Sequence, residues 1–283
     1  MGSKIKVGIV STALLLVLGL SACDRGAPES AKPADAVDTQ AMIDLAKAAD
    51  TGDTQAMFDL GVMHYEGAGT PKDEAKAIQW LIKAADAGHA KAMFTLGVMH
   101  RDGTGTTKDY AKAIGWFTKS SEAGEPLAMY SLGRMASNGI GTPKNEAKAI
   151  QWYKKAADAG EPRAMYNLGV MDRDGIGTRQ DHAKAIQWFT KAADAGDAQA
   201  MYNLGMMHYE GAGTRQDYDK AIQWFTKASD AGDTLAMYNL GSMHYEGAGT
   251  RQDYAKAIQW FTKAARLGDA NAQAQLRRRG LNW

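Results

Sequence analysis

Four histidines stand at equivalent places along the chain and are the first candidates for metal chemistry: His64, His100, His208 and His244. Imidazole and carboxylate groups are common zinc ligands, and Asp172 and Glu210 add carboxylates to His208 and His244. No pair among these residues has the short spacing that places two ligands on one face of a helix. Because duplication of a sequence unit also leaves histidines in register, we expect no bound metal and no cofactor.

Patterns typical of enzymes are missing from the sequence. The one Ser-x-x-Lys pattern runs from Ser3 to Lys6, inside an apolar N-terminal segment. The sequence contains no His-Glu-x-x-His, no Gly-x-Ser-x-Gly and no phosphate-binding glycine loop. We therefore predict that the protein is not an enzyme.

The charge balance also excludes some partners. The 283 residues carry a formal net charge of +1, which gives no reason to expect binding to nucleic acid or to an anionic membrane surface. The basic run Arg277, Arg278 and Arg279 is interpreted as a solvated chain end.

Tryptophan recurs every 36 residues, each time within a near-copy of Ala-Lys-Ala-Ile-Gln-Trp, at positions 80, 116, 152, 188, 224 and 260. A period of this length marks a unit that cannot bury its own apolar face and must stack on its neighbours. Such stacks usually bind other proteins. The period therefore predicts a solenoid rather than a catalytic domain.

One unit, residues 53 to 88, predicts a pair of helices. In the first, called helix A, the apolar residues Ala56, Leu60 and Met63 fall on one helical stripe, and Gly67 can close the helix in the left-handed conformation. After the turn, Asp73 can cap a second helix, helix B.

The predicted inner face of helix B is formed by Ala77, Trp80, Leu81 and Ala84, and the helix closes at Gly88. The fold prediction is an all-α, α/α solenoid (superhelix) of six 36-residue helix-turn-helix repeats over residues 53–268.

A glycine follows the helix A leucine in every unit: Gly61, Gly97, Gly133, Gly169, Gly205 and Gly241. Glycine inside a helix is about 1 kcal/mol less favourable than alanine, so its recurrence indicates a steric need. We expect close approach of helix B, with the tryptophan ring filling the space that glycine leaves open. The tryptophans are thus predicted to be core residues.

Half-units are predicted to cap both ends of the array. Residues 37–52 predict a lone capping helix with Asp44 in the place of tryptophan, and residues 269–283 a C-terminal capping helix with Ala272 and Leu276 on its apolar stripe. Arg277 replaces the glycine there. Terminal units with a polar outer face are what a solenoid in water requires.

The pattern Ala-Met-Tyr-Asn-Leu-Gly, then Gly-x-Gly-Thr, then Asp-Tyr-Ala-Lys-Ala-Ile-Gln-Trp-Phe-Thr-Lys-Ala-Ala resembles the Sel-1-like repeat, a relative of the tetratricopeptide repeat. The tyrosine usual in that family four residues after the leucine is replaced here by the histidine series, by Ala136 and by Asp172. The resemblance implies a superhelix that acts as a protein-protein interaction scaffold or adaptor, in bacteria often at the cell envelope.

If the array curves like its tetratricopeptide relatives, helix A lines a concave face. The residue before each leucine, Asn167, Asn203 or Asn239 in three units, matches the asparagine of tetratricopeptide clamps, and Arg163 matches the clamp's basic residue. We predict a groove for an extended peptide, centred on residues 163 to 245. The predicted partner-binding residues are Arg163, Tyr166, Asn167, Arg173, Tyr202, Asn203, Tyr209, Tyr238, Asn239 and Tyr245. The alternative interpretation is that the asparagines bond to the neighbouring helix and hold the repeat spacing.

The N-terminus predicts an exported and anchored protein. Residues 1–22 have the basic start and short apolar run of a signal peptide, and Leu20-Ser21-Ala22-Cys23 resembles the bacterial lipobox, in which the cysteine carries a lipid. Residues 23–36 predict a lipidated flexible tether. The resemblance implies a lipid-anchored protein facing the periplasm, and Asp24 slightly favours the inner membrane.

Two other functions stay open. A few cysteine-rich Sel-1-like proteins have been described as β-lactamases or penicillin binders, but Cys23 is the only cysteine here, so a disulfide in each repeat is absent. A purely architectural lipoprotein without a specific ligand would share every feature of the adaptor. We expect a protein or peptide partner, with membrane contact through the lipid anchor and no small-molecule substrate.

Overall fold

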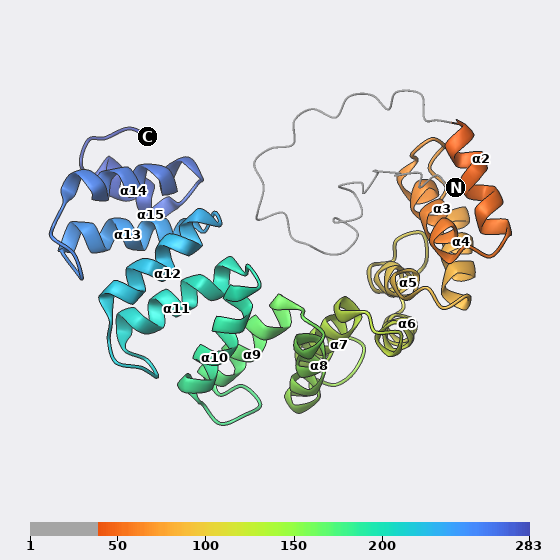
Figure 1. Cartoon of the computed structure of the whole chain (residues 1–283), viewed down its shortest axis with the longest axis horizontal. Helices are drawn as coiled ribbons and strands as arrows, with labels where there is room; N and C mark the ends of the chain where they lie inside the picture. Colours follow the sequence, from red (N-terminus) through yellow and green to blue (C-terminus); the bar gives the residue numbers. More distant parts are fainter. Residues whose placement is uncertain (1–38) are drawn as a thin grey trace, which may run out of the picture. The chain divides into compact units, whose positions relative to one another are not determined.

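The computed structural model describes residues 39–283, which form fourteen α-helices and no strand (Figure 1). The all-α prediction is confirmed. The predicted signal peptide, Cys23 and the tether lie outside the described residues. The helices are α2 (Thr39–Asp50), α3 (Thr54–Glu66), α4 (Glu74–Asp86), α5 (Ala90–Asp102), α6 (Tyr110–Glu122), α7 (Pro126–Asn138), α8 (Glu146–Asp158), α9 (Pro162–Asp174), α10 (His182–Asp194), α11 (Ala198–Glu210), α12 (Tyr218–Asp230), α13 (Thr234–Glu246), α14 (Tyr254–Arg266) and α15 (Ala270–Arg277).

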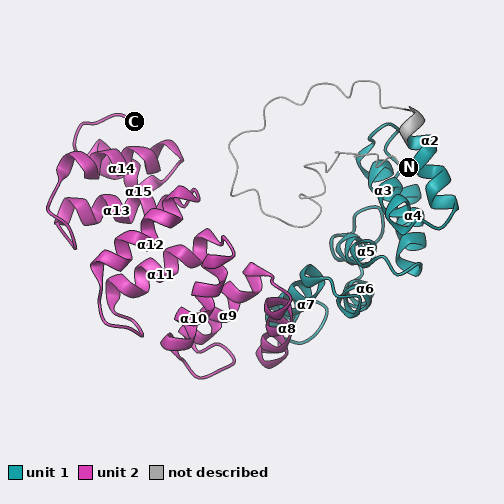
Figure 2. Cartoon of the chain, viewed as in Figure 1, with its two compact units in different colours: residues 1–144 teal, residues 145–283 magenta. Residues whose placement is uncertain are grey.

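The helices group into two compact units, divided between residues 144 and 145 (Figure 2). Within the first unit, each helix from α2 to α7 packs on the next. Within the second, the same holds from α8 to α15. Each unit is therefore a series of consecutive helix pairs. No helix in residues 39–283 has the length and apolar character needed to cross a membrane.

Local capping explains where the helices begin and end. The carboxylate of Asp53 accepts hydrogen bonds from the amides of Gln55 and Ala56 at the start of α3, and that of Asp73 accepts one from Lys76 at the start of α4. Gly67 closes α3 with φ of 74°, a left-handed conformation that costs glycine little. The predicted roles of Asp73 and Gly67 are confirmed.

The glycine inside helix A faces the side chain that follows the tryptophan, and this corrects the prediction for the tryptophan ring. A methyl group added at Gly205 would lie 2.5 Å from Cδ1 of Phe225. The same holds for four further pairs: Gly61 with Leu81, Gly97 with Phe117, Gly169 with Phe189, and Gly241 with Phe261. Close approach of helix B is confirmed. The side chain in the gap is fully buried; it is phenylalanine in four of these pairs and leucine in the first, and in none of them is it tryptophan.

The tryptophans lie one position away from that contact and are only half-buried. A lysine three residues later covers the exposed ring face in each repeat, as with Lys191, whose Nζ lies 4.5 Å from the Trp188 ring centroid. On the inner side, Trp116 and Trp224 pack against buried clusters whose members come from their own repeat and from the preceding one. The tryptophan thus packs at clusters that span two repeats, while the residue after it closes the helix pair: phenylalanine in four repeats and leucine in the first.

The terminal helices cover the ends of the two units. Ala49 on α2 packs with Ala56 and Leu60 of α3. At the other end, Ala272 and Leu276 of α15 are buried against α14. Arg277 on α15 is exposed, with its guanidinium 5.5 Å from the Trp283 ring.

Two helical glycines provide a matched test of this packing. We expect Gly205→Ala to lower the free energy of unfolding by about 1–2 kcal/mol, because overpacking against Phe225 exceeds the gain in helix propensity. Gly115 on α6 has no atom within 4 Å of an added Cβ. Gly115→Ala should therefore raise the free energy of unfolding by about 0.5–1 kcal/mol. Urea unfolding followed by circular dichroism measures both, and destabilisation of similar size at the two positions would contradict the packing described.

Candidate functional site

The ten predicted partner-binding residues lie in the second unit, on α9, α11 and α13. These are the A helices of three successive repeats, and α11 packs directly against α13. The structure therefore brings residues that are 36 positions apart in sequence to equivalent places on neighbouring helices. Asn167 and Tyr166 stand on α9, Tyr202 and Asn203 on α11.

Three tyrosines form a repeated feature of these helices. Tyr166, Tyr202 and Tyr238 are half-buried, and each ring packs on the phenylalanine that fills the glycine gap, with centroid distances of 5.7, 5.8 and 5.5 Å. Burial raises the pKa of Tyr166 and Tyr202 above the usual value of 10.0. Both hydroxyls therefore keep their proton at neutral pH and can donate a hydrogen bond.

Asn203 is buried and its amide is engaged within the chain. Its Nδ2 donates to the carbonyl of Gln199 at 2.8 Å, and Nη1 of Arg173 from the preceding repeat donates to its Oδ1. Arg173 also donates from Nε and Nη2 to the carboxylate of Asp174, at 2.7 and 3.0 Å. A partner that donates to the Asn203 carbonyl therefore shares that oxygen with Arg173 or displaces it.

Asn239 is placed in the same way with a different partner. Its Nδ2 lies 3.4 Å from the hydroxyl of Tyr202 and 3.6 Å from the sulfur of Met206, both on the preceding A helix. At these two asparagines the amide links neighbouring repeats, which is the arrangement of the alternative interpretation. Tyr202 is consequently held from two sides, by Phe225 behind it and by Asn239 beside it.

Arg163 lies in the first turn of α9 and forms an ion pair. Its Nε donates to Oε1 of Glu161 at 2.7 Å, and the same carboxylate oxygen accepts from the backbone amide of Arg163 as the N-cap of the helix. Glu161 is buried. A carboxylate from a partner would compete with Glu161 for the guanidinium.

Tyr209 and Tyr245 lie near the C-terminal ends of their helices and pair with tyrosines of the following B helix. The ring centroids of Tyr209 and Tyr218 are 5.3 Å apart, and those of Tyr245 and Tyr254 are 5.1 Å apart. Arg279 stacks on Tyr245, with its guanidinium 4.6 Å from the ring centroid. Sequence reasoning missed this contact.

The basic run at the chain end therefore needs a correction. Arg279 is half-buried and bonds through Nη1 to the carbonyl and the side-chain oxygen of Gln275, both at 2.7 Å. Arg277 and Arg278 are exposed, as expected for a solvated chain end. No pattern in the sequence singled out Arg279, because its partner ring lies in the preceding repeat.

The backbone carbonyl of each histidine in the series accepts a hydrogen bond of 2.8 Å from the amide of the aspartate that caps the following helix B. His64 and His208 are buried, and Nδ1 of each of the four imidazoles has no hydrogen-bond partner within the described residues. Nowhere in residues 39–283 do three His, Cys, Asp or Glu residues gather closely enough to hold a metal ion.

The chain repeats a unit of two helices, in which a glycine of the first helix contacts a buried side chain of the second. This arrangement defines an α-helical repeat protein. The sequence profile of the Sel1 repeat matches six consecutive segments, 54–89, 90–125, 126–161, 162–197, 198–233 and 234–269. The chain therefore belongs to the Sel1 repeat family. Proteins with Sel1 repeats are generally protein-interaction scaffolds, and the fold is typically non-enzymatic.

Two solved structures resemble the chain over most of its length. A Sel1 repeat protein from Oxalobacter formigenes is 33% identical, with a TM-score of 0.68 over 80% of this chain and 99% of its own. The protein c5321, a protective antigen of uropathogenic Escherichia coli strains with an SLR fold, is 31% identical with a TM-score of 0.79. That match covers 82% of this chain, which spans only half the length of the Escherichia coli structure. Among curated proteins, none matches the chain.

The four imidazoles predict a pH-dependent stability. Burial first, and then a nearby lysine, lowers the pKa of His64, His100, His208 and His244 below the ordinary value of 6.5. The unfolded chain then binds protons more readily than the folded chain. The stabilisation is complete above about pH 6.5 and is lost as the pH falls below it.

We expect the free energy of unfolding, measured in urea between pH 7.5 and 5.5, to fall with pH. The variant His64→Ala with His208→Ala should lose stability at all pH values and give a shallower pH dependence. Alanine is tolerated in this place, since Ala136 occupies it in the third repeat. An unchanged slope would contradict the buried, neutral imidazoles.

Proposed function

We propose that the protein is a non-enzymatic scaffold that binds an extended segment of a partner protein across α9, α11 and α13. The observation that carries the proposal is the row of tyrosines 166, 202 and 238. Each is half-buried and supported from behind by a fully buried phenylalanine, as Tyr202 is by Phe225. A ring that is already held in place loses little conformational entropy when a partner covers its other side.

The polar groups beside these rings favour a partner with an exposed backbone. One tyrosine hydroxyl and one asparagine amide stand at equivalent places on each of α9, α11 and α13, so these three repeats offer donors and acceptors to a chain that passes over them. Arg173 can contribute by exchanging its bond with Asn203 for one with the partner. Tyrosine and arginine are also the residue types that contribute most to protein interfaces.

The other functions have less support. The β-lactamase alternative rests on cysteine-rich relatives, and this chain has a single cysteine, far outside the repeats. The architectural alternative makes a different prediction, since it requires no partner on the tyrosine row. The experiment below separates it from the scaffold.

We further propose that the scaffold acts at the bacterial cell envelope, held by a lipid on Cys23 and facing the periplasm, with the inner membrane favoured by Asp24. The sequence before Asp24 supports this through its lipobox. Cys23→Ser should move the protein from the membrane fraction to the soluble fraction, as measured by fractionation and immunoblotting. An unchanged distribution would contradict the lipid anchor and leave the scaffold proposal standing.

Site-specific photocrosslinking tests the binding surface in cells that express the protein naturally. Tyr245, at the end of the tyrosine-bearing face, and Tyr110, on α6 in the other unit, have nearly equal exposure, 38% and 37%. We expect a photoreactive benzoylphenylalanine at position 245 to trap a discrete partner, and the same group at position 110 not to trap it.

The variant Tyr202→Ala with Tyr238→Ala should lose this crosslink from position 245 while keeping its helical circular dichroism. Equal trapping from both positions would place the interface elsewhere. No trapping from position 245 would favour the architectural alternative.

A further inference from the structure

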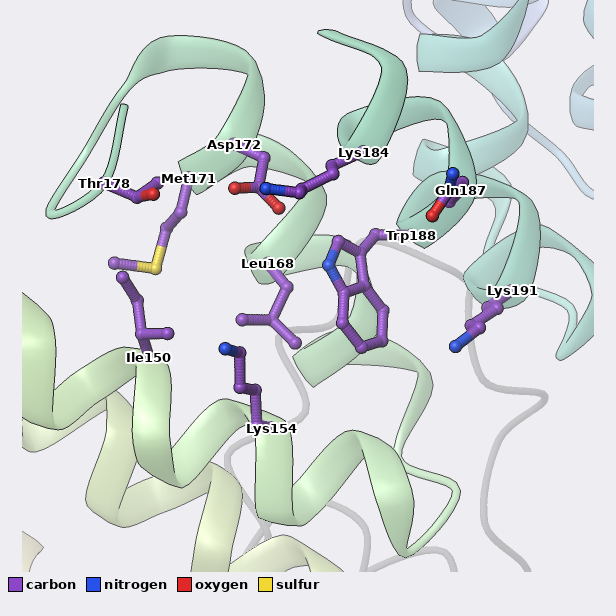
Figure 3. A pocket seen from close by; sticks show the side chains of 10 residues that line it. All are labelled: Ile150, Lys154, Leu168, Met171, Asp172, Thr178, Lys184, Gln187, Trp188 and Lys191. Atoms are coloured by element: carbon purple, nitrogen blue, oxygen red, sulfur yellow. The ribbon is translucent and has the colours of Figure 1, made fainter. Parts of the chain in front are cut away.

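A cavity of about 320 Å³ opens in the second unit between α8, α9 and α10 (Figure 3). Its apolar lining comes from Ile150, Leu168, Met171 and the ring of Trp188. The charged lining consists of Lys154, Lys184 and Lys191 with one carboxylate, Asp172. A cavity of this size, with an apolar wall and a few charged groups, has the dimensions of a site for a small ligand.

Two of these lining residues depart from the repeat pattern. Most of the lining is common to all six units: an isoleucine, a leucine, a methionine, the tryptophan and two lysines recur at the equivalent places. Lys154, in contrast, replaces a threonine or an isoleucine, and Asp172 replaces a histidine or an alanine. The two departures stand 18 positions apart on different helices and meet in one cavity.

The exchange at position 154 changes the chemistry of the surface. In three other repeats the equivalent threonine hydroxyl donates to a carbonyl of its own helix, as Thr190 does to Ile186 at 2.7 Å, and Thr118 and Thr226 do likewise. Lys154 is exposed and brings a full positive charge to the rim of the cavity. A hydroxyl that is already hydrogen-bonded within its own helix is thus replaced by an ammonium group that can bind an anion.

The remaining charges are already engaged or weakened. Nζ of Lys184 lies 3.2 Å from the carboxylate of Asp181, and Nζ of Lys191 lies over the Trp188 ring. Burial raises the pKa of Asp172, which accepts a hydrogen bond from Trp188 and lies in the field of Lys184 and Lys154. With Lys184 paired to Asp181, the ammonium groups of Lys154 and Lys191 face the single carboxylate of Asp172, so the cavity keeps a net positive charge that attracts an anion. The carboxylate of Asp172 also repels a second negative charge, which favours a monoanion over a phosphate dianion.

We propose that this cavity binds a small organic carboxylate, whose anionic group pairs with Lys154 and whose apolar body rests against Ile150, Leu168 and the Trp188 ring. The site goes beyond the protein-binding surface described above and does not depend on it. The bound molecule is a ligand that the scaffold carries or senses.

Indole resonances give a direct test, because each of the seven tryptophans has one N–H signal in a ¹⁵N–¹H spectrum of the full chain. Benzoate is the probe, with benzyl alcohol as its neutral match and benzylamine as its cationic match. We expect benzoate to shift the Trp188 signal more than any other, with a dissociation constant of about 1–10 mM for so small a ligand. The two matched compounds should bind at least about tenfold more weakly, which corresponds to about 1.4 kcal/mol.

Lys154→Thr restores the residue found in four other repeats, so the variant is expected to fold. It should weaken benzoate binding at least about tenfold. Lys155→Thr is the matched control: it removes the same charge from the neighbouring position of α8, which does not line the cavity. Benzoate binding by the control should change by less than about twofold.

A transplant variant tests whether the two departures are sufficient. Thr190→Lys with His208→Asp places the same pair one repeat further on, beside Trp224. Benzoate should then shift the Trp224 signal as well as that of Trp188. Equal shifts of all repeat tryptophans, no shift, equal binding of benzyl alcohol, or equal losses in the two lysine variants would overturn the proposal.

Discussion

The contact between the glycine of helix A and the buried ring of helix B is the constraint on which the rest of the structure depends. With hydrogen in place of a side chain, the backbone of α11 comes so close to Phe225 that a single added carbon would overlap the ring. The ring is 1% exposed, so it cannot move outward without leaving a cavity. This contact fixes the distance between the two helices of a repeat. It thereby fixes what the other side chains can reach.

Two consequences of this contact bear on function. On one side of the phenylalanine lies the tyrosine of helix A, supported from behind and half-open to solvent. On the other side, the tryptophan packs against a buried cluster that spans two repeats, with its outer face beneath a lysine. Because the tryptophan recurs in all six repeats and the tyrosine on its phenylalanine in the last three, they form a uniform background. Against it, the residues that differ between repeats, such as Lys154, Asp172 and Arg173, are the candidates for specific recognition.

Most of the fold could be predicted because it depends on local chemistry. Helix spacing, the capping carboxylate of Asp73 and the left-handed Gly67 are each specified within a few residues of sequence. In contrast, the sequence does not predict whether tryptophan or phenylalanine is the ring that fills the gap. Trp224 and Phe225 are neighbours on the same apolar face, about 100° apart, and which one meets Gly205 depends on how the two helices cross.

The candidate site was predictable in part. The tyrosine and asparagine positions followed from the repeat register and from likeness to tetratricopeptide clamps. The bonds that engage those residues did not, because Arg173 with Asn203 and Tyr202 with Asn239 are contacts between repeats, 30 and 37 positions apart. The stacking of Arg279 on Tyr245 was not predicted for the same reason, because it too is a contact between neighbouring units. Contacts of this kind depend on the rotation between successive repeats, and a strict 36-residue period in the sequence does not specify that rotation.

The most direct measurement of the central contact is the set of nuclear Overhauser effects from the Hα protons of Gly205 in the folded chain. The structure predicts strong effects to the ring protons of Phe225 and none to the indole protons of Trp224. Strong effects to Trp224 in place of Phe225 would mean that helix B is rotated by one residue. The tyrosine row and the carboxylate cavity would then lose their common support.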